Sequence, residues 1–201
     1  MTAGRRDDRT GEDPSQADVR ERILDTASGL FYRRGVRAVG VDLVVEAAGV
    51  AKTSLYRHFR TKDDLIAAFL QREDEDFWAC WDRAAAGHEQ DAAAELKAQL
   101  AWIGERVGRQ GYRGCPQLNV AAEFPEEDHP ARVVARAHKL ELRRRLQDIA
   151  ERLQADRPER LAVQLAVVIN GAFVSSQVLG PGDATPILAE IVRALVAASR
   201  R

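Results

Sequence analysis

The sequence predicts an all-α protein, with an N-terminal three-helix unit that contains a helix-turn-helix and a larger helical part after it. Three observations support this organisation. Apolar residues recur at the spacing of one helix face from Asp18 onward, and no stretch alternates as a strand would. Gly35, Gly49 and Pro130 stand at the ends of such periodic stretches. Residues 19–62 carry nine Lys and Arg against four Asp and Glu, although the whole chain has a net charge of −1.

Length and composition place the chain among ordinary globular proteins. Its 201 residues, 45% of them apolar, can bury one good-sized core or two small ones. No apolar run is long enough to cross a bilayer and the N-terminus has no signal-type apolar region, so we expect a cytoplasmic protein without a membrane partner. Cys80 and Cys115 lack the spacing of a metal site or a disulfide framework, and we expect reduced thiols, no metal and no cofactor.

The N-terminal part is predicted to hold a disordered arm and one helix. Residues 1–17 are rich in charge, Gly and Pro, which is typical of a disordered segment. The helix is expected to begin at Asp18, which forms an N-cap and N3 pair with Glu21, and to end before Gly35. Its apolar stripe consists of Val19, Ile23, Ala27, Leu30 and Phe31.

Two short helices, predicted over 41–48 and 52–59, are separated by a turn centred on Gly49. Gly49 can adopt the left-handed conformation that a tight turn needs, and Val50 can fill the space between the helices. This spacing is typical of a helix-turn-helix, and we assign residues 18–62 to that domain. The side chains expected to face its core are Leu43, Val44, Ala47, Leu55 and Phe59.

Residues 63–201 are predicted to form a second, entirely helical domain. Thr61 and Asp64 provide a capping box for a long helix that runs past Trp81. The remaining helices follow from apolar periodicity and from prolines at helix starts. They are expected over 92–109, in a broken stretch over 111–124, after Asp128-His129-Pro130, over 158–179, and from Thr185-Pro186 to residue 200.

The third helix carries side chains suited to a DNA major groove. Lys52, Thr53 and Ser54 lie in its first turn and face away from the core, where a recognition helix contacts base edges. Contacts to phosphates are expected from the cationic, phenolic, imidazole and hydroxyl groups that follow. These belong to Tyr56, Arg57, His58, Thr61 and Lys62. An ordinary solvated helix face is the alternative interpretation.

Five short runs of residues occur in order between positions 19 and 66. They are Phe31-Tyr32-Arg33-Arg34-Gly35, Val41-Asp42, Ala48-Gly49-Val50, Leu55-Tyr56-Arg57-His58-Phe59 and Thr61-Lys62-Asp63-Asp64-Leu65. Together they resemble the N-terminal domain of the TetR family (tetracycline-repressor-like) of transcriptional regulators. Three positions depart from the family pattern. Gly40 and Ala51 stand where a hydroxyl residue often caps a helix, and Val45 replaces a customary small Ala.

The resemblance implies a dimeric, ligand-responsive transcriptional regulator, which we interpret as a repressor. It would bind a palindromic operator in double-stranded DNA and be released by a small-molecule inducer. Its two recognition helices would lie about one turn of DNA, roughly 34 Å, apart. The apolar helices over 158–179 and 185–200 are expected to form the homodimer, although the first could instead be the centre of a monomer core.

Aromatic and polar residues within the apolar helices are candidates for the lining of a ligand pocket in the second domain. A buried Asn or His needs a partner and can orient a small molecule, whereas each aromatic residue alone is more often a core residue. The candidates are Trp78, Trp102, Asn119, Phe124, His138, Asn170 and Phe173.

Cys115 supports two other hypotheses. The same DNA-binding regulator could be triggered by oxidation of Cys115 instead of by a ligand. Alternatively, Cys115 could be the nucleophile of an enzyme with His138 as its base. No third orienting residue is evident, so we expect no enzyme activity.

Overall fold

The computed structural model describes residues 14–179 and 181–200, and these residues contain only helices and no strand. The all-α prediction is therefore confirmed. None of the described helices is apolar over enough residues to cross a bilayer. In chain order the helices are α1 (Pro14–Arg34), α2 (Val41–Ala48), α3 (Lys52–His58), α4 (Lys62–Ala85), α5 (Ala92–Val107), α6 (Pro116–Glu123), α7 (Pro130–Arg152), α8 (Pro158–Leu179) and α9 (Pro181–Ala198).

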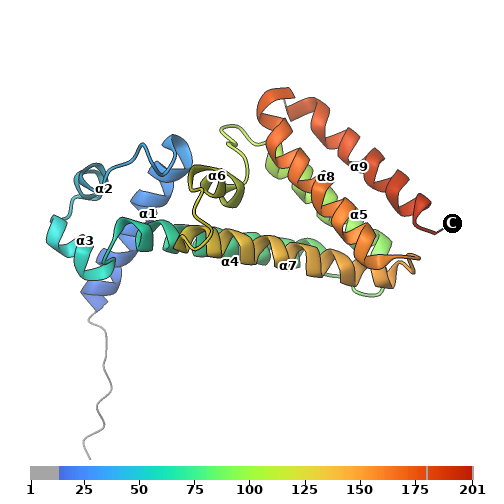
Figure 1. Ribbon diagram of the computed structural model, residues 1–201, viewed down its shortest axis with the longest axis horizontal. Coiled ribbons are helices and arrows are strands. Elements are labelled where there is room, and N and C mark those ends of the chain that lie inside the picture. Colours follow the sequence, from blue (N-terminus) through green and yellow to red (C-terminus); the bar gives the residue numbers. More distant parts are fainter. Residues whose placement is uncertain (1–13, 180, 201) are drawn as a thin grey trace, which may run out of the picture.

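The molecule is elongated, with the long helices α4 and α7 side by side along its length (Figure 1). Helices α1, α2 and α3 lie at one end of this pair, and α5, α8 and α9 lie at the other. The short helix α6 lies between the two ends and packs against α7 and α4. Helix α6 is therefore placed to contact both halves of the protein.

Helix α1 begins at Pro14, one turn before the predicted start at Asp18. The prediction of a cap at Asp18 was wrong, because Asp18 stands inside the helix and lies 3.8 Å from the Arg22 guanidinium one turn on. A proline suits a first turn, since its missing N–H would have no intrahelical partner there. Of the predicted disordered arm, residues 14–17 are helical and residues 1–13 lie outside the described residues.

The helix-turn-helix elements are close to the predicted ones. Helix α2 spans the predicted residues, and α3 ends at His58 with Phe59 as its C-cap. The buried residues of α2 are Val44 and Ala48, four positions apart on one face, whereas the predicted Ala47 is exposed. Position 47 lies about 100° around the helix from position 48, which turns its side chain out of the core.

Two predicted boundaries in the second half were also wrong. Helix α5 ends at Val107 rather than at residue 109. Helix α9 begins at Pro181, so Pro186 stands inside the helix and does not start it. Pro181 itself occupies the first helical position, where a proline is favoured, and Pro186 removes only one backbone donor near the beginning of the helix.

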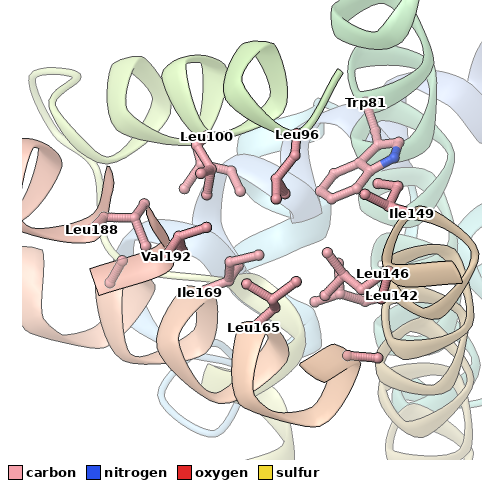
Figure 2. Packing of buried hydrophobic residues seen from close by; sticks show 14 of the residues in the cluster. Trp81, Leu96, Leu100, Leu142, Leu146, Ile149, Leu165, Ile169, Leu188 and Val192 are labelled. Carbon is pink, nitrogen blue, oxygen red and sulfur yellow. The ribbon is translucent and has the colours of Figure 1, made fainter. Parts of the chain in front are cut away.

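Buried apolar side chains form two clusters. One, the N-terminal cluster, lies beneath α1, α2 and α3 and includes the first half of α4, with Val120 of α6 and Ala135 of α7. The other fills the space between α4, α5, α7, α8 and α9, where Leu96 and Leu100 of α5 approach Val192 of α9 (Figure 2). Helix α4 is one continuous helix whose first half belongs to one cluster and whose second half belongs to the other, so it connects the two ends of the molecule.

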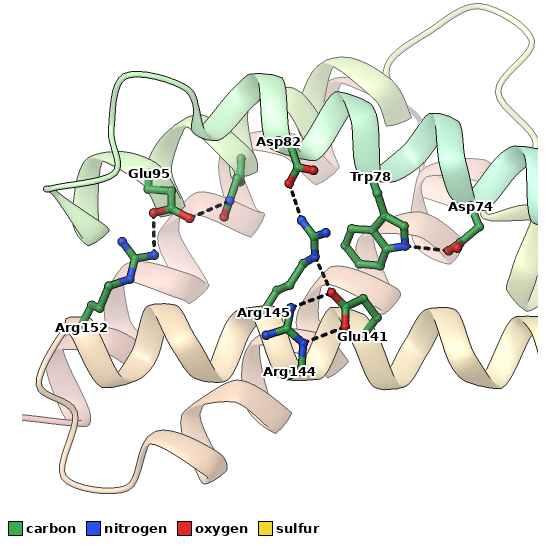
Figure 3. Close-up of polar contacts among 9 residues, drawn as sticks. Asp74, Trp78, Asp82, Glu95, Glu141, Arg144, Arg145 and Arg152 are labelled. Carbon is green, nitrogen blue, oxygen red and sulfur yellow. Dashed lines mark hydrogen bonds and ion pairs between the residues drawn. The ribbon is translucent and has the colours of Figure 1, made fainter.

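Polar contacts reinforce the packing of α4 and α5 against α7 (Figure 3). Arg145 of α7 forms an ion pair with Asp82 of α4, and its guanidinium lies 4.4 Å from the centre of the Trp78 ring. The Arg152 guanidinium lies 2.6 Å from the carboxylate of Glu95, a buried residue of α5. These contacts fix the register of α7 against both neighbours.

Candidate functional site

The turn between α2 and α3 is closed by backbone hydrogen bonds around Gly49. Gly49 has φ 63° and ψ 41°, a left-handed conformation that glycine adopts without steric penalty. Its N–H donates to the Glu46 carbonyl at 3.2 Å, and the Val50 N–H donates to the Val45 carbonyl at 3.1 Å. These bonds form a Schellman motif, which ends α2 and directs the chain into α3. The predicted conformation of Gly49 is confirmed.

Two apolar side chains on the inner face of α3 pack this helix against its neighbours. Leu55 and Phe59 are buried in the N-terminal cluster, as predicted. The Phe59 N–H donates to the Leu55 carbonyl at 2.8 Å, which closes the last turn. The Arg20 guanidinium of α1 lies 5.3 Å from the centre of the Phe59 ring. The opposite face of α3 is therefore turned to solvent in a fixed orientation.

The solvent face of α3 brings together the side chains predicted to contact DNA. The exposed ones are Lys52, Thr53, Tyr56 and Arg57, while Ser54 and His58 are half-buried. The Lys52 ammonium lies 2.7 Å from the Asp42 carboxylate of α2. This hydrogen bond raises the pKa of Lys52, and it occupies the side chain in the free protein. The predicted contact of Lys52 with DNA would therefore require this ion pair to open.

The start of α4 lies next in the chain. Thr61 Oγ1 accepts a hydrogen bond from the Asp64 N–H at 3.0 Å, and the Asp64 carboxylate accepts one from the Thr61 N–H at 3.0 Å. The predicted capping box is confirmed. The Thr61 hydroxyl proton remains available as a donor. Partial burial lowers the pKa of Lys62, and the nearby carboxylates of Asp63 and Glu123 act in the opposite direction.

The departures from the family pattern have visible local consequences. Gly40 and Ala51 occupy the N-cap positions of α2 and α3, and neither helix has a side-chain cap bond. Both short helices therefore depend on packing rather than on capping for their start. Val45 is half-buried and packs against the N-terminal cluster.

Sequence reasoning missed a contact from α6 to the helix-turn-helix domain. The Glu123 carboxylate, at the end of α6, accepts hydrogen bonds from the backbone N–H groups of Val36 at 3.2 Å and Arg37 at 2.8 Å. These two residues lie in the loop between α1 and α2. No local pattern marks Glu123, because its partners are more than 80 positions away.

The other end of α6 is tied to the same domain through Tyr32 of α1. The Tyr32 hydroxyl accepts a hydrogen bond from the Arg113 N–H at 2.9 Å and donates one to the Gly114 carbonyl at 3.2 Å. Burial raises the pKa of Tyr32, so the hydroxyl remains a donor. Both ends of α6 are therefore bonded to the domain that carries α3.

Phe124, a predicted pocket residue, belongs to this link. Its ring stacks on His129 at 3.8 Å between centres, and the Arg37 guanidinium lies 5.3 Å from its centre. His129 Nδ1 accepts a hydrogen bond from the Ala131 N–H, and Nε2 lies 3.5 Å from the Asp63 carboxylate of α4. Phe124 therefore connects the loop after α1 to the start of α7.

A partly buried group of polar side chains links α4 to α7. Asp74 Oδ1 lies 2.6 Å from His138 Nδ1 and 2.7 Å from Trp78 Nε1. Desolvation lowers the pKa of His138 to about 4, although Asp74 acts in the opposite direction. The imidazole is thus neutral at pH 7, and because the carboxylate can only accept, Nδ1 carries the proton. This leaves Nε2 as an acceptor without a partner among the residues that the structure describes.

The predicted pocket residues fall into two groups. Four of them surround the ring of Phe77, with ring centres 4.8 to 6.3 Å away. These are Trp78, Trp102, His138 and Phe173. Asn170 lies nearby and accepts a hydrogen bond from Lys139 at 2.8 Å. Asn119 and Phe124 lie elsewhere, because Asn119 donates to the Arg113 carbonyl at 2.7 Å beside α1.

The space among the central residues is almost closed. A void of about 10 Å³, enough for about one water molecule, is bordered by Tyr112, Gln117 and His138, together with Glu73 and Arg106. The first three residues each carry a buried polar atom without a hydrogen-bond partner among the described residues. Two of these atoms are acceptors and the Tyr112 hydroxyl is a donor. A ligand with complementary groups would satisfy them if the helices separated.

Cys115 borders the same void. Its Sγ lies 3.4 Å from Lys139 Nζ, and the thiol is buried. The nucleophile and base pair considered from the sequence is not formed in the described part of the chain, because His138 Nδ1 is bonded to Asp74 and Nε2 contacts no polar atom there.

A polar, partly cationic helix held by a tight glycine turn, at one end of a helical bundle, defines a helix-turn-helix DNA-binding regulator. Residues 23–69 match the model of the bacterial regulatory proteins of the tetR family. The sav143 protein of Streptomyces avermitilis, described as a TetR-type transcriptional regulator, is 32% identical over 90% of this chain and 97% of its own, with a TM-score of 0.81. The chain belongs to the TetR family of transcriptional regulators.

Other relatives agree with this membership. SCO4454, a TetR-family regulator from Streptomyces coelicolor, is 27% identical over 92% of this chain and 98% of its own, with a TM-score of 0.87. The transcriptional activator FasR of Mycolicibacterium smegmatis is 41% identical over 64 residues, and the repressor KstR2 of Rhodococcus jostii is 37% identical over 71. These matches cover 32% and 35% of this chain, and they span only 29% and 33% of FasR and KstR2.

Proposed function

We propose that the protein is a dimeric, ligand-responsive transcriptional repressor, which binds a palindromic operator and is released from it by a small-molecule inducer. The solvent face of α3 carries this proposal, since cationic and hydroxyl side chains stand there on a helix fixed from behind by Leu55 and Phe59. In this proposal residues 18–62 bind DNA, and residues 63–201 dimerise and bind the inducer.

The division of roles on the DNA follows the position of each side chain. Lys52, Thr53 and Ser54 stand in the first turn of α3, the end that enters a major groove, and would contact base edges. The phosphate contacts would come from Tyr56, Arg57, His58, Thr61 and Lys62. Thr61 and Lys62 stand at the N-terminus of α4, where free N–H groups and the positive end of the helix dipole would also favour a phosphate.

Dimerisation is supported by apolar side chains that the described chain leaves uncovered. Val163, Val167, Val174 and Val178 form one row on α8, and Ile187 and Ile191 are exposed on α9. Gly171 stands in the same row, and a Cβ added there would meet nothing within 4 Å. A partner helix can therefore approach α8 closely at Gly171, and burial of the row would drive association.

A two-fold dimer through α8 and α9 would present two copies of α3 on one side of the assembly. Operator half-sites are then read by identical helices, which explains the expected palindrome. The distance between the two α3 helices must match about one turn of DNA, roughly 34 Å. Any change that tilts one end of the molecule relative to the other would alter that distance.

The inducer is proposed to open the void next to His138 and to pair its unsatisfied polar atoms. Of the candidate lining, Trp78, Trp102, His138 and Phe173 would contact it. Gln117 borders the void and belongs to α6, whose Glu123 holds the loop between α1 and α2. A shift of α6 would therefore move the domain that carries α3. Inducer and DNA would then favour different conformations and weaken each other's binding.

The DNA interface is tested by footprinting the full-length protein on its own upstream DNA at several salt concentrations. Lys52→Ala should relax sequence preference, because Lys52 would contact a base. Lys62→Ala should weaken binding to all sequences alike and reduce the salt slope by about one unit, because it would contact a phosphate. A missing footprint, or one without salt dependence, would contradict the proposal. Identical behaviour of the two variants would contradict the division of roles.

The dimer face is tested separately by light scattering of size-fractionated protein. Gly171→Trp should produce monomers, since the added ring would hold the partner helix away. Val133→Trp is the control, because Val133 is also an exposed apolar residue but lies on α7. A monomeric wild-type protein, or an unchanged dimer in Gly171→Trp, would contradict dimerisation through α8.

A thiol trigger at Cys115 is the second candidate, and the Lys139 ammonium 3.4 Å from Sγ favours it. Oxidation of the thiol to a sulfenic acid adds an oxygen that this ammonium can bind by a hydrogen bond, so the buried position can hold the oxidised form. In this case peroxide should reduce operator affinity of the wild type and leave Cys115→Ser unaffected. Equal responses of both proteins would leave the small-molecule inducer as the trigger.

A further inference from the structure

A second hollow, far larger than the central void, lies between α5 and α9. Its volume is about 690 Å³, within the range of small-molecule sites, whereas the void next to His138 measures about 10 Å³. Its lining is mostly apolar, and it includes Val196 and the edges of the core residues Leu96, Leu100 and Val192. The upper part of Figure 2 shows Leu96 and Leu100 of α5 opposite Val192 of α9. We call this hollow the α5–α9 groove.

The charges of the α5–α9 groove all have one sign. Three cationic residues line it, Lys97 on α5 and Arg193 and Arg200 toward the C-terminal end of the chain, and no Asp or Glu does. Lys97 and Arg193 form no ion pair with the described residues, and Arg200 donates from Nε to the Leu153 carbonyl at 3.1 Å. An apolar hollow with unneutralised cations is complementary to a ligand with an apolar body and an anionic end.

The groove is on a different face of α9 from the proposed dimer surface. Ala189, Arg193 and Val196 line the groove, at spacings of four and three residues. Ile187 and Ile191 are exposed on the other side of the same helix. A dimer through α8 and α9 would therefore leave the groove open, and α9 would lie between a ligand and the partner subunit.

We propose that the α5–α9 groove binds a long-chain carboxylate. The apolar chain lies between α5 and α9, and the carboxylate is held by Lys97 and Arg193. This site is separate from the void next to His138, and occupancy draws α9 toward α5. The regulatory consequence rests on the proposed function, since a displaced α9 would change the dimer and with it the distance between the two α3 helices. The binding itself requires neither DNA nor dimer.

Isothermal titration of the full-length protein with dodecanoate and with dodecan-1-ol tests the site directly. The carboxylate should bind at one site per chain and about tenfold more tightly than the alcohol, because only the carboxylate can bond to the two cations. Lys97→Glu/Arg193→Glu should lower dodecanoate affinity at least about tenfold. Arg143→Glu, a charge reversal at an exposed position of α7, should leave it unchanged.

Variants that place a bulky side chain in the groove provide an independent test. Ala189→Trp should abolish dodecanoate binding while thermal unfolding remains cooperative, and Ala101→Trp, on the α5 side of the groove, replaces it if the first variant does not fold. Absence of dodecanoate binding overturns the proposal, as does equal affinity for the alcohol or binding that survives both the charge reversal and the filled groove. These results leave the DNA footprint untouched, so failure of this site and failure of the proposed function are told apart.

Discussion

The buried His138 should make the stability of the protein fall in mildly acidic solution. Its side chain is 1% exposed, and desolvation lowers its pKa from the ordinary 6.5 to about 4. The groups that face it are Asp74, which favours the protonated form, and Lys139 and Arg106, which oppose it. Protonation therefore has to overcome burial and two neighbouring cations.

The size of the effect follows from the two pKa values. Between pH 6.5 and pH 4 the unfolded chain binds a proton at position 138 that the native protein does not bind. This part of the native stability is thus present in full above pH 6.5, is lost progressively as the pH falls from 6.5 to the folded pKa of about 4, and falls no further below it. Each pKa unit corresponds to about 1.4 kcal/mol, so the full loss is about 3 kcal/mol, of which about 2 kcal/mol appears between pH 7 and pH 4.5.

Urea unfolding at a series of pH values measures this loss of stability. The comparison is with a variant in which position 138 does not titrate. His138→Gln keeps an amide donor for Asp74 but does not titrate, so its stability should fall by about 2 kcal/mol less than that of the wild type between pH 7 and pH 4.5. The variant retains Glu73, whose pKa is raised by burial and whose own contribution cancels in the comparison. His88→Gln, in the loop between α4 and α5, serves as the control. Parallel curves for wild type and His138→Gln would refute the reasoning.

Three further predictions concern stability and are measured by urea unfolding at pH 7. Gly49→Ala should destabilise the protein by about 1–2 kcal/mol, because alanine is strained at φ 63°, and an unchanged midpoint would show that the turn relaxes. Gly40→Ser should stabilise it by about 0.5–1 kcal/mol, since the serine hydroxyl can cap α2 in open space; a loss would contradict this. Arg152→Ala should cost about 1–2 kcal/mol, because it leaves the buried Glu95 carboxylate without its cation, and a neutral result would mean that water replaces the guanidinium.

The helix-turn-helix could be predicted from sequence because its signals are local. Gly49 marks the turn, and the four-residue spacing of Leu55 and Phe59 marks the buried side of α3. Helix starts were predicted less well, since the same residues suit more than one position. An aspartate such as Asp18 can cap a helix or, inside a helix, pair with a cation one turn on. A proline such as Pro186 can start a helix or stand in its first turns.

Residue type alone does not predict which of the candidate pocket residues come together. Trp78 and His138 come together because α4 and α7 lie side by side, and the sequence does not state which helices pair. Asn119 and Phe124 are separated from them because α6 turns Asn119 toward α1, and Phe124, which follows α6, stacks on His129. The Glu123 bonds to the loop after α1 depend on tertiary packing alone, so no periodic pattern could reveal them.

Binding of a DNA duplex that carries the upstream sequence, measured as a function of salt for the wild type and two charge reversals, tests the central claim most directly. Arg57→Glu changes the exposed face of α3, and Arg143→Glu makes the same change on α7. The account predicts salt-dependent binding that Arg57→Glu abolishes and Arg143→Glu preserves. A wild type that ignores the duplex, or two variants that bind it equally, would contradict the assignment of α3 as the DNA-reading helix.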